Sequence, residues 1–254
     1  MLKIGFGIFF SLKEVYKMKR SEVAEYIRSI KDPEKLLNYC RRFHEEEPRD
    51  VAYVVSRNIV SRDPNNVSFI LAGAKIIIIT WNAIRFQRLP KGVRANLEND
   101  ILEAYTKTKW ELEKLRGERL ENLNLTSKEW EEIVKKIFLE FSSKKSMEFT
   151  GASKVLHVLN PFVFMMWDSN IRNAYHKLHT SNHKPGSPEC YLEFLKQSQE
   201  IIKAILSKRS EDDIWNAHLT FVDKDFMKAF SFRESMLKMV DECNYVRFKL
   251  NIKL

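Results

Sequence analysis

The run from Val67 to Arg85, VSFILAGAKIIIITWNAIR, is apolar on nearly every face of a helix. A helix of that kind is stable only when other elements surround it, so the run predicts a buried helix at the centre of a bundle. Its β-branched part, IIIIT, fits a strand as well, but no partner strands with turn signals lie near it in the sequence. Apolar residues recur at helical spacing along nearly all of the chain. We therefore expect an all-α fold, a multi-helix bundle of about ten helices.

Start signals and periodicity set the bounds of the expected helices. Asp32 precedes a proline at a first helical position, and Thr126 or Ser127 fits as the cap of a helix with an acidic first turn. The stretch TSNHKPGSP, from Thr180 to Pro188, is the clearest loop. The expected helices are Ser21–Ile30, Pro33–Glu46, Asp50–Val60, Val67–Arg85, Val93–Leu115, Ser127–Phe141, Gly151–Leu159, Ser169–Leu178 and Pro188–Leu206, with one or two more between Glu211 and Cys243.

The chain of 254 residues is long enough to bury one large core. We expect residues 21–254 to form a single domain, preceded by an N-terminal segment at residues 1–20. Within that segment, IGFGIFFSL is too short to span a bilayer and lacks a small-residue cleavage site. Translation could also start at Met18, because MKRSEVAEYIRSI opens an ordinary amphipathic helix.

The cysteines Cys40, Cys190 and Cys243 are odd in number and far apart, which is typical of a reduced, cytoplasmic protein. Glutamine is scarce and lysine, glutamate and isoleucine are abundant, a bias typical of proteins from thermophiles. We expect a monomer that uses no cofactor and no membrane.

The net charge points to a polyanionic partner. Lysine and arginine number 43 against 34 aspartates and glutamates, which gives a formal charge of +9 and a pI near 9.3. Such a balance favours nucleic acid, although many basic proteins bind no anion specifically.

The stretch from Phe149 to Tyr175, FTGASKVLHVLNPFVFMMWDSNIRNAY, places one lysine and one aspartate among small and apolar residues. Lys154 falls in the first turn of the helix expected at 151–159, where unpaired N–H groups and the helix dipole disfavour an ammonium. Asp168 is placed as the N-cap of the next helix. The first helix is about 14 Å long and the chain after it can return about 23 Å, so Asp168 can arrive beside Lys154. The alternative interpretation is that Lys154 is an ordinary surface residue and Asp168 only caps a helix.

The segment TGASKVLHVLNPFVFMMWDSNIR resembles the core of the helix-hairpin-helix DNA glycosylase superfamily. In that family a G-x-G-x-K-[TV]-A hairpin leads into a helix and then into a V-D-x-H-[VI]-x-R segment. Lys154 matches the Schiff-base lysine of the bifunctional members, and Asp168 matches the aspartate that nearly all members carry. Ile171 and Arg172 match the hydrophobic and basic positions that follow it.

The resemblance implies a fold and an activity. The fold would place helices in two subdomains around a central cleft, with the hairpin and catalytic core at residues 147–176. The activity would be excision of a damaged base flipped out of double-stranded DNA, with lyase action at the abasic site. The amine of Lys154 would attack C1′ of the sugar, and Asp168 would activate the amine or stabilise positive charge. Thr150 and Ala152 stand where the hairpin has its two glycines, and the lysine-to-aspartate spacing is a few residues shorter than usual.

Further residues are candidates for contact with DNA. The family's wedge at the end of a buried early helix corresponds to Asn82, although an asparagine that bonds a neighbouring carbonyl fits equally. The run RFQRLPKGVR fits a phosphate-contacting loop or a solvated connection between helices. The candidate DNA-binding residues are Asn82, Arg85, Arg88, Lys91, Arg94, Gly151, Ser153 and Arg172, and the candidate base-stacking residues are Trp81 and Trp167, which also fit core positions.

His176, His179 and His183 lie close to Cys190 in the sequence, at a spacing that superficially suggests a metal site. No cysteine pair or acidic partner completes a zinc pattern, so we expect no metal there. Two functions remain open at this point: a DNA glycosylase with lyase activity, and a non-catalytic helical protein that binds nucleic acid or a protein partner and keeps only the scaffold.

If the run from Arg85 to Arg94 contacts phosphates, binding to duplex DNA depends steeply on salt. Four such contacts predict a loss of affinity of roughly a hundredfold between 50 mM and 200 mM salt, because each contact releases condensed counterions. Fluorescence anisotropy with a labelled duplex measures this slope. A flat dependence would indicate a protein partner instead.

Overall fold

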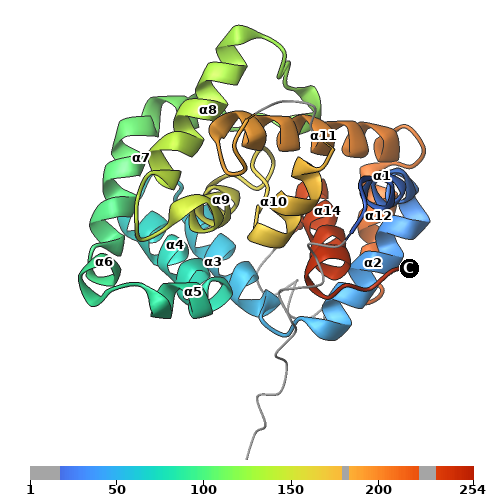
Figure 1. Ribbon diagram of the computed structural model, residues 1–254, viewed down its shortest axis with the longest axis horizontal. Coiled ribbons are helices and arrows are strands. Elements are labelled where there is room, and N and C mark those ends of the chain that lie inside the picture. The colour runs from blue at the N-terminus through green and yellow to red at the C-terminus, as the bar shows by residue number, and fades with distance from the viewer. Residues whose placement is uncertain (1–17, 179–182, 223–232) are drawn as a thin grey trace, which may run out of the picture.

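The computed structural model describes residues 18–178, 183–222 and 233–254, and these contain thirteen α-helices and no strand (Figure 1). The all-α prediction is confirmed. Part of the expected loop from Thr180 lies outside the described residues. The helices are α1 (Arg20–Ser29), α2 (Pro33–Glu46), α3 (Asp50–Arg62), α4 (Val67–Trp81), α5 (Ala83–Arg88), α6 (Lys91–Ala95), α7 (Leu97–Lys114), α8 (Lys128–Ser142), α9 (Glu148–Leu159), α10 (Ser169–His176), α11 (Pro188–Leu206), α12 (Glu211–His218) and α14 (Met236–Asn244).

Helices α3 to α9 occupy one side of the molecule in Figure 1, and α1, α2, α12 and α14 occupy the other. Helix α11 bridges the two groups, because it packs against both α8 and α14. After α14 the chain continues as a π-helical turn, Tyr245–Lys249, which packs against α10 and α2.

Helix α4 is less enclosed than its sequence predicts. It packs against α3, α7 and α9, but Ile79 faces outward and is 50% exposed. The helix also ends at Trp81 instead of continuing to Arg85, because Asn82 leaves the helical conformation (φ −116°, ψ 17°) before α5 begins. The expectation of one continuous helix there is wrong, and the same holds for residues 93–115, which divide into α6 and α7.

The α9 helix begins earlier than expected. It starts at Glu148, whose φ of +48° marks the end of the short connection from α8. Lys154 therefore lies in the second turn, and the prediction that it occupies the first turn is wrong. Thr150, Gly151 and Ser153 are buried inside the helix.

Capping signals at other helix starts are confirmed. The Asp32 carboxylate accepts hydrogen bonds from the backbone of Glu34 and Lys35, and the Ser127 hydroxyl accepts one from Trp130. Ser21 is not a cap, because α1 already begins at Arg20. No helix in the described ranges is long and apolar enough to cross a membrane.

The close packing of α3 on α4 depends on Gly73. A Cβ at this position would lie 2.5 Å from Val60 Cγ2 and 2.8 Å from the carbonyl oxygen of Ser56. The backbone of α3 cannot move away without opening the core, so Gly73→Ala should cost about 1–3 kcal/mol. A thermal melt should show Tm lower by about 3–10 °C.

Gly92→Ala is the matched control, because its Cβ meets nothing within 4 Å and alanine favours a helix. Its Tm should stay level or rise. Equal melting of Gly73→Ala and the parent chain would show that α3 and α4 are packed less closely than described.

Candidate functional site

Lys154 points from α9 towards the end of α4. Its side chain is 7% exposed, and the Nζ atom donates a 2.6 Å hydrogen bond to the backbone oxygen of Trp81, the last residue of α4. The last carbonyls of a helix have no partner within it and carry the negative end of the dipole. The amine is therefore held at a helix C-terminus, not at the N-terminus that the sequence suggested.

Burial lowers the pKa of Lys154 to about 8, against the opposing effect of Asp168 and Asp241, whose charges raise it. Asp168 is the N-cap of α10, as predicted, and its Oδ1 accepts hydrogen bonds from the backbone N–H of Asn170 (2.8 Å) and Ile171 (3.0 Å). Lys154 and Asp168 thus belong to one electrostatic site, at the boundary between the two groups of helices. At pH 7 roughly a tenth of the amine is neutral.

Asp241, on α14, is a third member of this site that the sequence analysis missed. It is 2% exposed, and burial raises the pKa of its carboxyl to about 8, assisted by Asp168 and opposed by Lys238. Lys154 and Asp241 therefore both titrate near pH 8, and because they interact, the two steps belong to the pair. We call Lys154, Asp168 and Asp241 the lysine site.

Trp81 forms a wall of the lysine site. Its indole Nε1 donates a 2.8 Å hydrogen bond to the backbone oxygen of Arg49, and the guanidinium of Arg49 lies 6.0 Å from the ring. Arg49 in turn donates to Glu47 Oε1 at 2.7 Å and to the Tyr245 hydroxyl at 2.9 Å. Trp81 is only 8% exposed, so stacking on a base requires these neighbours to move; the stacking role stays a prediction.

Trp167 lies in the core. It is 1% exposed, and its ring packs against Phe138, Tyr191 and Phe194 in the core between α8 and α11. Base stacking by Trp167 would require its ring to leave the core; the stacking role stays a prediction.

Gly151 and Ser153 do not reach the surface either. A Cβ on Gly151 would lie 3.0 Å from Ile78 and 3.6 Å from the amide nitrogen of Asn82, so this glycine lets α9 approach α4. The Ser153 hydroxyl accepts a 2.8 Å hydrogen bond from the backbone of Trp167. Contact of DNA with Gly151 and Ser153 would require α9 to separate from its neighbours, and it stays a prediction. Asn82 is also buried in this arrangement, so a wedge role needs it to swing out.

The basic run lies at the surface on α5 and α6, two short helices where a loop was expected. Arg88, Lys91 and Arg94 are exposed, and Arg85 forms an ion pair with Glu148 at the start of α9. The run therefore borders the helix that carries Lys154. Its contact with phosphate stays a prediction.

Arg172 lies on α10, where its guanidinium covers the rings of Phe149 (5.5 Å) and Trp167 (5.8 Å). Among the histidines near Cys190, His176 Nδ1 lies 3.9 Å from the Cys190 sulfur and His183 is exposed, whereas His179 lies outside the described residues.

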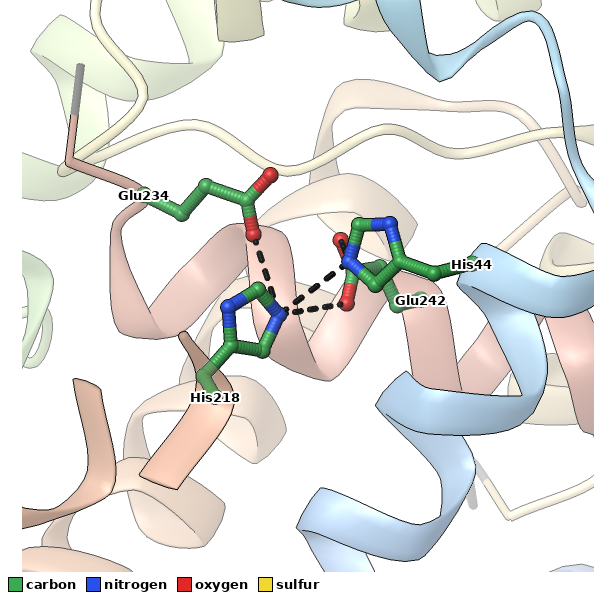
Figure 2. A group of neighbouring side chains, drawn as sticks. All are labelled: His44, His218, Glu234 and Glu242. Carbon is green, nitrogen blue, oxygen red and sulfur yellow. Dashed lines mark hydrogen bonds and ion pairs between the residues drawn. The ribbon is translucent and has the colours of Figure 1, made fainter. Parts of the chain in front are cut away.

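A different group in the described chain has the residue types of a metal site, and we call it the His–Glu cluster: His44, His218, Glu234 and Glu242 (Figure 2). The two imidazole Nε2 atoms lie 3.2 Å apart. His218 Nε2 lies 3.4 Å from an oxygen of each glutamate, and His44 Nε2 lies 3.5 Å from Glu242 Oε1. All four ligand atoms fall within 4.8 Å of one another.

The sequence held a partial signal for this cluster. Glu234, Lys238 and Glu242 are spaced at i, i+4 and i+8, which places them on one helical face. His44 and His218 come from distant helices, and no local spacing connects them to that face.

Comparisons of the chain with protein-family models, with curated proteins and with solved structures found no match. The function therefore has to be argued from the two sites themselves.

The ionisation of Lys154 can be measured directly. The Cε resonance of Lys154 in lysine-labelled protein, assigned with Lys154→Gln, should titrate near pH 8. Asp168→Asn should move this pKa lower, because it removes a negative charge that favours the ammonium.

Asp32→Asn is the matched control, since Asp32 is also a helix N-cap but lies on α2 and does not act on Lys154. It should leave the Lys154 pKa unchanged. Titration of Lys154 above pH 10 would mean that its amine is solvated.

Proposed function

We propose that this chain is a base-excision enzyme, a DNA glycosylase with AP lyase activity in which Lys154 is the nucleophile. The observation that carries the proposal is the buried amine with a pKa of about 8 in one site with Asp168. An amine attacks an electrophilic carbon only when deprotonated, so a depressed pKa suits a nucleophilic lysine. The partner in this proposal is double-stranded DNA with a damaged base or an abasic site, and no cofactor takes part.

The reaction assigns a role to each member of the lysine site. The amine nitrogen bonds to C1′ as the bond from C1′ to the base breaks, and the base leaves with that electron pair and gains a proton. The new ammonium then loses a proton and the sugar ring opens, which gives an imine. Loss of a C2′ proton expels the 3′ phosphate. Asp168 stabilises positive charge on the sugar, and Asp241, when ionised, is the nearby base that takes a proton from the amine.

The arrangement of helices supports the proposal in outline. Helices α8 and α9 pack together across a short connection, α9 carries the lysine, and the aspartate caps the helix that follows. This order resembles the hairpin, lysine helix and aspartate segment of the helix-hairpin-helix glycosylases. Because the amine is 7% exposed and bonded to Trp81, a nucleotide can reach it only after the wall around Trp81 opens.

A non-catalytic binding protein is the second candidate. The hydrogen bond from Lys154 to the end of α4 favours it, since that bond satisfies an otherwise unpaired carbonyl and gives the lysine a purely structural role.

Reductive trapping distinguishes a glycosylase with lyase activity from a non-catalytic binding protein. If Lys154 forms an imine with an abasic or damaged nucleotide, borohydride reduces it to a permanent protein–DNA link. Lys154→Gln should abolish both the link and strand cleavage. The trapping rate of the parent chain should rise with pH up to about 8 and then level off, because the neutral amine is the reactive form. Asp168→Asn should slow base release and leave DNA affinity largely intact, since asparagine keeps the helix cap.

Lys249→Gln is the control, because Lys249 is exposed yet close enough to influence the Lys154 pKa. It should still form the trapped link, with the pH dependence of trapping moved slightly higher, because the positive charge of Lys249 lowers the Lys154 pKa. Trapping that persists in Lys154→Gln would identify another amine, and no trapping across a broad panel of lesions would favour the binding protein.

A further inference from the structure

The spacing of the His–Glu cluster matches that of a four-coordinate metal site. Tetrahedral Zn²⁺ with bonds of about 2.0–2.2 Å holds its ligand atoms about 3.3–3.6 Å apart. His218 Nε2 lies close to this spacing, at 3.2 Å from His44 Nε2 and 3.4 Å from one oxygen of each glutamate, and all four ligand atoms lie within 4.8 Å of one another. Figure 2 shows the Nε2 atoms of the two imidazoles facing each other, with an oxygen of Glu234 and an oxygen of Glu242 beside His218 Nε2.

The charges around the cluster are unbalanced without a cation. Among the described residues, three carboxylates, Asp50, Glu234 and Glu242, face one ammonium, that of Lys238, which leaves two negative charges when all three acids are ionised and both imidazoles are neutral. The side chains of Glu234, Glu242 and Lys238 are fully buried. Uncompensated charge in such surroundings costs several kcal/mol, and a divalent cation would cancel it.

Glu234 supplies an independent sign of a missing partner. Its carboxylate is completely buried, and in the described part of the chain no donor makes a hydrogen bond to either of its oxygens. The nearest nitrogens are His218 Nε2 at 3.4 Å and Lys238 Nζ at 4.0 Å. Buried polar groups are nearly always satisfied, so a carboxylate aimed into a cluster of imidazoles points to a bound ion.

The surroundings also orient one ligand. Asp50 Oδ2 lies 3.8 Å from His44 Nδ1, on the side of the ring away from the cluster, and Lys238 holds Glu242 Oε1 at 2.5 Å. At 3.8 Å Asp50 makes no hydrogen bond to His44, but it places a negative charge beside the imidazole.

From these observations we propose that His44, His218, Glu234 and Glu242 bind one divalent transition-metal ion, with Zn²⁺ the best fit. Imidazole and carboxylate together suit Zn²⁺ and its first-row neighbours, whereas Mg²⁺ and Ca²⁺ prefer oxygen ligands alone. Four protein ligands in a buried place make a closed, structural site. The ion would tie the end of α12 to α2 and α14. This inference is independent of the proposed activity of Lys154.

Protonation is the competing way to neutralise the cluster. Burial and the neighbouring Glu242 raise the pKa of the Glu234 carboxyl well above its usual range, so a proton could reside there instead. The two arrangements respond differently to Glu234→Gln. Glutamine imitates a protonated glutamate and would leave a metal-free cluster as stable as before, whereas it removes a ligand and a charge from a metal site.

The test starts from untagged protein stripped with a chelator and then given Zn²⁺ or Co²⁺. After desalting, elemental analysis should find one zinc per chain, and the Co²⁺ form should show the visible d–d bands of a four-coordinate ion. Zinc at a hundredfold excess over its Kd should raise Tm by about 5–10 °C, and Mg²⁺ should not. Glu234→Gln and His218→Asn should each weaken zinc binding by at least about tenfold.

Glu200→Gln and His183→Asn are matched controls, because both residues are exposed and distant from the cluster, and they should bind zinc like the parent chain. If a ligand variant fails to fold, the Co²⁺ spectrum and the zinc-dependent Tm of the parent chain still show whether the cluster binds a metal ion. Absence of retained zinc together with absence of the cobalt bands would overturn the proposal, as would zinc binding that Glu234→Gln and His218→Asn leave unchanged.

Discussion

The compensation of charge in α14 is the constraint on which the rest of the structure depends. All of α14, Met236–Asn244, is buried, although it carries a lysine, an aspartate and a glutamate. Each buried charge costs several kcal/mol unless neighbours pair with it. Lys238 is paired with Glu242 and Asp50, and these carboxylates raise its pKa well above its usual range despite burial. The helices α2, α3 and α9 therefore lie where their polar side chains can meet α14.

The lysine site also depends on the compensation of buried charge around α14. Asp241 is buried by the helices around α14, and Lys154 reaches the same region from α9. Burial is the largest influence on both groups, and it raises the pKa of the acid and lowers that of the amine until both are about 8. Two buried groups with strongly shifted pKa values in one site are a pattern that is frequent at functional sites, although structural ion-pair networks produce it too.

Local sequence signals were sufficient for much of the fold. The period of apolar residues and caps such as Asp32 and Asp168 depend on nearby residues alone, and they placed most helices correctly. The breaks at Asn82 and Asn96 were missed because neither position is a proline or a glycine, so no local signal marks them. The burial of α14 was not predicted, because the sequence analysis expected only one or two helices between Glu211 and Cys243, and the His–Glu cluster was missed because its histidines come from distant helices.

The two sites are joined through α14, where Asp241 and Glu242 are neighbours in sequence that act on different clusters. Glu242 raises the pKa of Asp241 and Lys238 lowers it, so the charge state of the His–Glu cluster is felt at the lysine site. A divalent cation bound by the His–Glu cluster would add positive charge that the buried groups of the lysine site feel, because Coulomb interactions are strong in a buried region. It would lower the pKa of Asp241 and, acting on Lys154 in the same direction, favour the neutral amine. If the cluster binds a metal, its charge would therefore be felt by the buried groups of the lysine site, whatever the function of Lys154.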